Sequence, residues 1–188
     1  MKKGIIAILA VVVIIGAWFL MSYNKLVTLN EAVGGQWAQV EVQYQRRLDL
    51  IPNLVESVKG AMSQEQEVFT ALAEARTRYA GAASVNDKVA AAGQVESALG
   101  RLLVVMENYP ELKSIETVQT LMAQLEGTEN RISVERIRFN DQIRLFNVMI
   151  KRLPTNLIAG FLGFDEKLYF QAANGSEVAP QVNLELNK

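Results

Sequence analysis

Residues 4–21, GIIAILAVVVIIGAWFLM, form eighteen consecutive residues without a charge, directly after Lys2 and Lys3. As an α-helix they would extend about 27 Å, close to the hydrocarbon thickness of a bilayer. A cleaved signal peptide has a similar basic start, but it needs small residues at its cleavage site, and the residues from Trp18 to Tyr23 are mostly bulky. The stretch therefore predicts a retained transmembrane anchor over residues 1–24, in preference to a signal peptide or a buried core helix.

The basic residues that flank this stretch predict its orientation. Lys2, Lys3 and the terminal amine lie on the amino-terminal side, and Lys25 is the basic residue close to the other end. We therefore expect a cytoplasmic amino terminus and a body on the outer or periplasmic face. Residues 4–21 would contact membrane lipid.

Composition excludes several classes of function. Without Lys2 and Lys3 the chain keeps 17 basic residues against 20 acidic ones, so it lacks the basic surplus of a nucleic-acid-binding protein. It contains no cysteine and no histidine, which removes disulfides, thiolate metal sites, histidine-activated nucleophiles and histidine zinc sites. A carboxylate-only enzyme or metal site stays a catalytic alternative, because carboxylates alone can do acid–base work. The sequence predicts a non-enzymatic protein without a catalytic residue, cofactor or metal.

The rest of the chain has the apolar period of amphipathic helices, so the predicted fold is all-α. The first stripe consists of Val33, Trp37, Val40, Tyr44, Leu48, Ile51, Val55, Val58 and Met62, and it continues toward Gly81. Pro52 interrupts it and predicts either a kink in one long helix or a reversal between two. Ser84 and Asp87 indicate the start of a helix over residues 85–108, and Pro110 the start of another over residues 110–153. The prediction is an antiparallel bundle over residues 25–153, with four helices or three and a kink.

The last predicted helix is much longer than its neighbour, so its second half needs cover. Residues 154–171 are apolar and could fold back over it, or another subunit could supply the cover. Asn140 and Asn147 are seven residues apart, and they would need partners if buried. The charged run over residues 129–138 suits a solvated face, or a buried pair with Arg46 or Arg47. Residues 172–188 are predicted to be a flexible tail, in which residues 182–186 could alternatively pair as a strand.

Several long motifs stand out in the sequence, and they are QWAQVEVQ at 36–43, RRLDLIPNLV at 46–55, ENYPELK at 107–113 and LEGTENRI at 125–132. Together they resemble the LemA family of bacterial membrane proteins. One departure is Phe139, where the family pattern usually has tyrosine. The resemblance implies one amino-terminal anchor in the bacterial inner membrane, an antiparallel bundle usually described with four helices, and no established enzymatic activity. Genes of the family often lie beside membrane-protease genes, which suggests an adaptor or envelope-stress role.

Two functional hypotheses follow. The first is a membrane-anchored helical scaffold that forms homo-oligomers and organises the bacterial envelope. The second is an adaptor for a membrane protease or another membrane protein. Their candidate contact residues, which could equally be folding signatures, are Arg46, Arg47, Asp49, Tyr109, Phe139, Phe146, Phe161 and Phe164.

Overall fold

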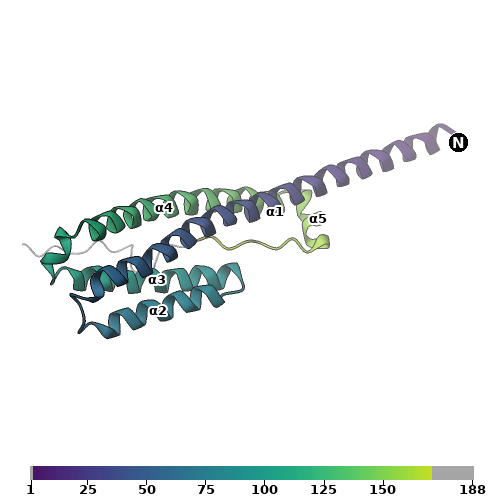
Figure 1. Ribbon diagram of the computed structural model, residues 1–188. Coiled ribbons are helices and arrows are strands. Elements are labelled where there is room, and N and C mark those ends of the chain that lie inside the picture. The colour runs from purple at the N-terminus through teal and green to yellow at the C-terminus, as the bar shows by residue number, and fades with distance from the viewer. Residues whose placement is uncertain (1, 171–188) are drawn as a thin grey trace, which may run out of the picture.

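The computed structural model describes residues 2–170, and every regular element in that range is a helix. In chain order they are α1 (Lys2–Lys59), α2 (Gln66–Gly81), α3 (Val85–Met106), the 3₁₀ helix η1 (Pro110–Ser114), α4 (Glu116–Lys151) and α5 (Thr155–Leu162). Four long helices lie side by side, and the amino-terminal part of α1 projects alone (Figure 1). The predicted all-α bundle of long helices is confirmed, and it has four of them because the chain reverses between α1 and α2. The predicted tail at 172–188 lies outside the described residues.

Helix α1 runs through Pro52 without interruption, so a reversal at this proline is wrong. A proline inside a helix costs about 3 kcal/mol, but Ile51 and Leu54 beside it are completely buried, and their packing favours the continuous helix. The helix also does not continue into α2. The chain reverses over residues 60–65, and the first of these is Gly60, a residue that weakens a helix.

The predicted start of α3 is confirmed in detail. The backbone N–H of Asp87 donates to Ser84 Oγ at 3.0 Å, and the same hydroxyl donates to the Asp87 carboxylate at 2.7 Å. The predicted single helix from residue 110 is wrong at its beginning. Pro110 starts the short helix η1, where Leu112 is fully buried, and α4 begins only at Glu116. Burial of Leu112 fixes this separate turn between the two long helices.

The bundle consists of two helix pairs, α1 with α4 and α2 with α3. Along the first pair, the rings of Trp37 and Phe139 lie 5.4 Å apart, and Arg47 forms an ion pair with Glu129. Ten residues forward on α1 therefore correspond to ten residues back on α4. This antiparallel register places the end of α4 beside the part of α1 that follows the apolar stretch.

After α5, residues 163–170 fold back along α4, and we call this segment the strap. The Asn147 amide accepts from the Lys167 N–H at 2.9 Å and donates to the Lys167 carbonyl at 2.8 Å. Asn140 makes the same two bonds with Phe170, at 2.7 and 2.9 Å. Seven helical residues and three extended residues both cover about 10 Å, so the two pairs stay in step. In the structure, the second half of α4 is thus covered by the strap of the same chain.

Two helices in residues 2–170 are long and apolar enough to cross a membrane, by length and composition. In α1 no residue of the apolar window is buried within the structure, whereas in α3 one third of the window is buried, including Leu99 and Leu102. The exposed window lies in the part of α1 that projects from the bundle (Figure 1). It matches the predicted anchor.

Candidate functional site

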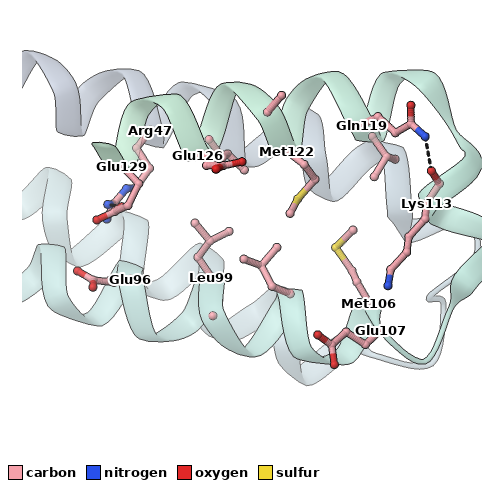
Figure 2. Close-up of a pocket in the computed structure, with 15 residues that line it drawn as sticks. Arg47, Glu96, Leu99, Met106, Glu107, Lys113, Gln119, Met122, Glu126 and Glu129 are labelled. Carbon is pink, nitrogen blue, oxygen red and sulfur yellow. Dashed lines mark hydrogen bonds and ion pairs between the residues drawn. The ribbon is translucent and has the colours of Figure 1, made fainter. Parts of the chain in front are cut away.

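A groove of about 860 Å³ lies between α3 and α4, each of which packs more closely on its own partner helix. Its walls are mainly apolar (Figure 2), and they include Leu99, Leu103, Met106, Val118, Met122 and Leu125. The volume falls within the range of pockets that hold small ligands or the anchor side chains of a partner. We call this feature the α3–α4 groove.

The polar residues that line the α3–α4 groove are predominantly acidic. Four carboxylates line it, together with two cationic side chains, and these residues are Glu96, Glu107, Glu126, Glu129, Arg47 and Lys113. At one end, the Gln119 amide donates to the Lys113 carbonyl at 2.6 Å and closes the turn between η1 and α4 (Figure 2). The excess of negative charge favours a binding partner that carries positive charge.

Arg47 lies at the inner end of this groove and is only 1% exposed. It forms an ion pair with Glu129, whose side chain is 46% exposed, and its guanidinium lies 5.6 Å from the centre of the Tyr44 ring. Its Nη1 atom has no hydrogen-bond partner in the described part of the chain. Burial lowers the pKa of Arg47, and the nearby Tyr44 and Glu96 oppose that effect.

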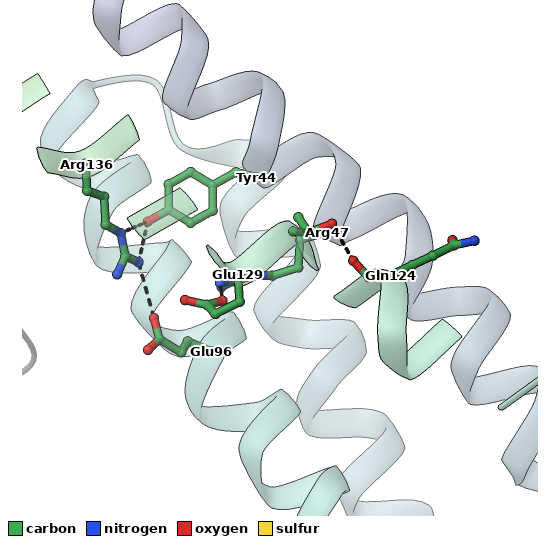
Figure 3. A network of polar contacts seen from close by, with 7 residues as sticks. Tyr44, Arg47, Glu96, Gln124, Glu129 and Arg136 are labelled. Carbon is green, nitrogen blue, oxygen red and sulfur yellow. Dashed lines mark hydrogen bonds and ion pairs between the residues drawn. The ribbon is translucent and has the colours of Figure 1, made fainter. Parts of the chain in front are cut away.

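A second arginine links three helices beside this pair (Figure 3). Arg136 of α4 donates to the Tyr44 hydroxyl of α1 at 3.0 and 2.6 Å, and it forms an ion pair with Glu96 of α3 at 3.2 Å. Its guanidinium also lies 4.5 Å from the ring centre of Phe170 in the strap. Burial raises the pKa of Tyr44, and the positive charge and hydrogen bonds of Arg136 partly offset this rise. The network therefore joins α1, α3, α4 and the strap.

For the charged run on α4 we expected either a solvated face or a buried pair, and both occur. The Arg47–Glu129 pair is the buried alternative, while Arg138 and Glu135 form a surface pair at 2.8 Å. With carboxylates, amides and guanidinium groups but no histidine or cysteine in the sequence, the groove suits binding more than covalent chemistry.

Three of the eight candidate contact residues lie inside the chain. Phe139 packs on Trp37, Phe146 lies 6.2 Å from the Phe164 ring in an edge-on arrangement, and Arg47 is buried as described. Because Arg47, Phe139 and Phe146 are already covered within one chain, their side chains offer little surface to a partner. Arg47 is the one candidate that lines the α3–α4 groove.

The other five candidates are at or near the surface. Tyr109 is half-buried, and its hydroxyl donates to Glu65 at 3.2 Å, which joins the two turns at this end of the bundle. Arg46 and Asp49 are exposed on α1, and Phe161 on α5 is 84% exposed. These residues are not gathered into one site, and their roles stay predictions.

The walls of the groove were not identified from the sequence. The available signal was the width of the apolar face on α3, where Leu99, Leu102, Leu103 and Met106 cover more of the helix than one partner helix needs. Only the spacing between α3 and α4 shows that part of this face lines a groove.

Comparison with known proteins matches residues 36–184 to the model of the LemA family. The magnetosome proteins MamQ 1 and MamQ 2 of Paramagnetospirillum magneticum are each 29% identical over 211 residues, covering 97% of this chain and 77% of theirs. MamQ of Magnetospirillum gryphiswaldense is 29% identical over 196 residues, covering 89% of this chain and 72% of its own. With the family model matching most of its length, the chain belongs to the LemA family.

Proposed function

We propose that the protein is a membrane-anchored, non-enzymatic scaffold that self-associates and organises the bacterial envelope. The observation that carries this proposal is the continuity of α1 from the exposed apolar stretch into the core of the bundle. The part of α1 after Met21 extends about 57 Å as a helix, so no flexible linker separates anchor and body. Family membership and the MamQ relatives support a membrane-associated helical protein.

A row of apolar side chains on α4 supports self-association. Val134, Ile137, Leu145 and Val148 are all exposed, and with Asp141 between them they repeat every 3.5 residues on average. They lie on the side of α4 opposite the core positions. We call this row the α4 stripe. A seam with this period suits a second helix of the same kind, as in a coiled coil, and we propose that it meets the α4 stripe of another copy.

The mass of the protein in mild detergent tests this proposal. Replacing Ile137 and Leu145 with lysine is expected to convert an oligomer into a monomer, because two charges would enter the seam. Val104→Lys is the matched control, since Val104 is about as exposed as Ile137 but lies on α3. A wild-type protein that is strictly monomeric at micromolar concentration would contradict self-association. Equal masses for the stripe variant and the wild-type oligomer would exclude this seam.

The α3–α4 groove favours a second function, that of an adaptor for a membrane protease or another membrane protein. Its apolar walls suit the apolar face of a partner helix, and its carboxylates suit basic residues beside that face. In the proposed inner-membrane location the body lies on the periplasmic side, so such a helix would belong to an envelope protein.

A fluorescent amphipathic peptide with leucine on one face and lysine on the other provides a defined test. We expect saturable binding that weakens with salt and is lost in Glu126→Lys, which reverses a charge at the groove. Glu56→Lys is the control, because Glu56 is exposed on α1 outside the groove. Equal binding of a peptide with glutamate in place of lysine would refute the assigned charge preference.

A further inference from the structure

Helix α5 is apolar on both of its faces. Residues 153–164, which include the helix, contain no charged side chain. Ile158 and Ala159 are buried on its inner face, whereas Leu153, Leu157 and Phe161 are at least 70% exposed on the outer side. Such a concentration of exposed large apolar side chains around a short helix indicates an interaction surface.

The antiparallel register of α1 and α4 fixes where this surface lies along the anchor. Trp37 lies against Phe139, and twelve residues further along α4 the same register places Lys151 beside Lys25 of α1. Lys25 is four residues, or about 6 Å, beyond the end of the apolar stretch at Met21. Helix α4 therefore ends close to the level at which α1 would leave the bilayer.

Helix α5 follows α4 and contacts α1 at this level, at the base of its projecting part (Figure 1). Beside it on α1, Ser22 and Leu26 are buried, and Trp18 is partly buried against the core. Trp18 belongs to the apolar stretch itself. Helix α5 thus packs against α1 near the end of the apolar stretch, and the exposed side chains of α5 lie close to the anchor.

We propose that the outer face of α5 inserts into the boundary between headgroups and acyl chains of the bilayer that α1 crosses. This inference rests on the proposed membrane anchoring of α1. Basic residues lie at the same level, with Lys25 on α1 and Arg152 after α4 both exposed, while Lys151 pairs with Glu166 at 2.5 Å. Asp165 and Glu166 follow the helix on the other side, and Glu166 is the partner of Lys151. An exposed apolar face with basic side chains beside it is typical of a helix that lies in a membrane interface. The body is then attached to the membrane at two points and held at a fixed tilt.

The absence of cysteine from the sequence allows a direct test with single labelled positions. Phe161→Cys, Val104→Cys and Ile14→Cys would each carry a small polarity-sensitive fluorophore in full-length protein reconstituted into phosphatidylcholine–phosphatidylglycerol vesicles. All three native side chains are exposed, so the labels replace no core contact. Quenching is measured with brominated lipids and, separately, with iodide in water.

We expect the label at Phe161 to be quenched by brominated lipid nearly as well as the label at Ile14, and several-fold less by iodide than the label at Val104. Strong iodide quenching at Phe161 with lipid quenching at Ile14 would overturn the α5 contact and leave the anchor intact. Iodide quenching at Ile14 would overturn both the anchor and this inference. Protection of Phe161 from both quenchers would also overturn it, since protein would then cover α5.

Discussion

The buried Arg47–Glu129 pair predicts unequal effects for two substitutions that remove the same ion pair. Glu129→Gln leaves the guanidinium of Arg47, which is 1% exposed, without its ion-pair partner. Breaking a buried pair in this way costs about 3–5 kcal/mol. Because the Glu129 side chain is 46% exposed and water can approach it, we expect a loss of about 2–3 kcal/mol in the free energy of unfolding.

Arg47→Met should cost less, about 1 kcal/mol, although it changes the more buried residue. Methionine keeps an unbranched apolar chain in the core and removes the unfavourable burial of a charge, while Glu129 becomes hydrated. The remaining cost is the lost contact with the Tyr44 ring, worth about 1 kcal/mol. The double variant, with Arg47→Met and Glu129→Gln together, should have about the same free energy of unfolding as Arg47→Met alone.

Urea unfolding in mild detergent provides the measurement, with Trp37 fluorescence as the signal in a Trp18→Phe background. Trp37 reports on the body because it packs on Phe139 in the core. Glu126→Gln is the matched control on the same helix, and it should change stability by less than about 0.5 kcal/mol, as exposed substitutions usually do. A loss from Arg47→Met that equals or exceeds the loss from Glu129→Gln would refute the argument from unequal burial.

Three further predictions concern other parts of the body. Asn147→Ala removes two hydrogen bonds to the strap and should lower the free energy of unfolding by about 2 kcal/mol. Hydrogen exchange at the Lys167 amide should become faster, which distinguishes loss of the strap contact from a general loss of stability. Gly100→Ala should raise the midpoint of urea unfolding by the equivalent of about 0.5–1 kcal/mol, because a Cβ there would have no atom within 4 Å and alanine favours a helix. Burial raises the pKa of Tyr79, so its neutral form is favoured in the folded state. The contribution of Tyr79 to the free energy of unfolding should therefore be fully present below pH ~10 and decrease as the pH rises above that value. Tyr79→Phe should flatten that alkaline loss, and an unchanged slope in unfolding measured between neutral and alkaline pH would contradict this assignment.

The sequence predicted the helices well where one local signal decided the outcome. The apolar period gave the core face of α1, and the Ser84–Asp87 pattern gave the start of α3. It failed where packing competes with a local rule. Pro52 normally weakens a helix, but burial of its neighbours keeps α1 continuous, and the reversal occurs after Gly60.

The candidate site was harder to predict, because a groove depends on the distance between helices and a sequence pattern does not specify it. Met122 and Leu103 have the same apolar character as core residues, and only their position between two separately packed helix pairs places them in the groove. Asn140 and Asn147 show the opposite case. Their spacing was visible in the sequence, but the strap segment that matches it carries no recognisable motif.

The register of α1 and α4 also separates the proposed surfaces by height above the membrane. By that register the α4 stripe, at residues 134–148, lies at the same level along the bundle as residues 28–42 of α1, about 10–32 Å beyond Met21. Arg47, at the inner end of the α3–α4 groove, lies about 39 Å beyond it. Copies joined through the stripe would meet close to the bilayer, where the proposed contact of α5 with the membrane would fix their tilt. The groove uses an earlier part of α4, residues 118–129, which lies farther from the bilayer than the stripe. It would stay accessible, so self-association and partner binding can occur together.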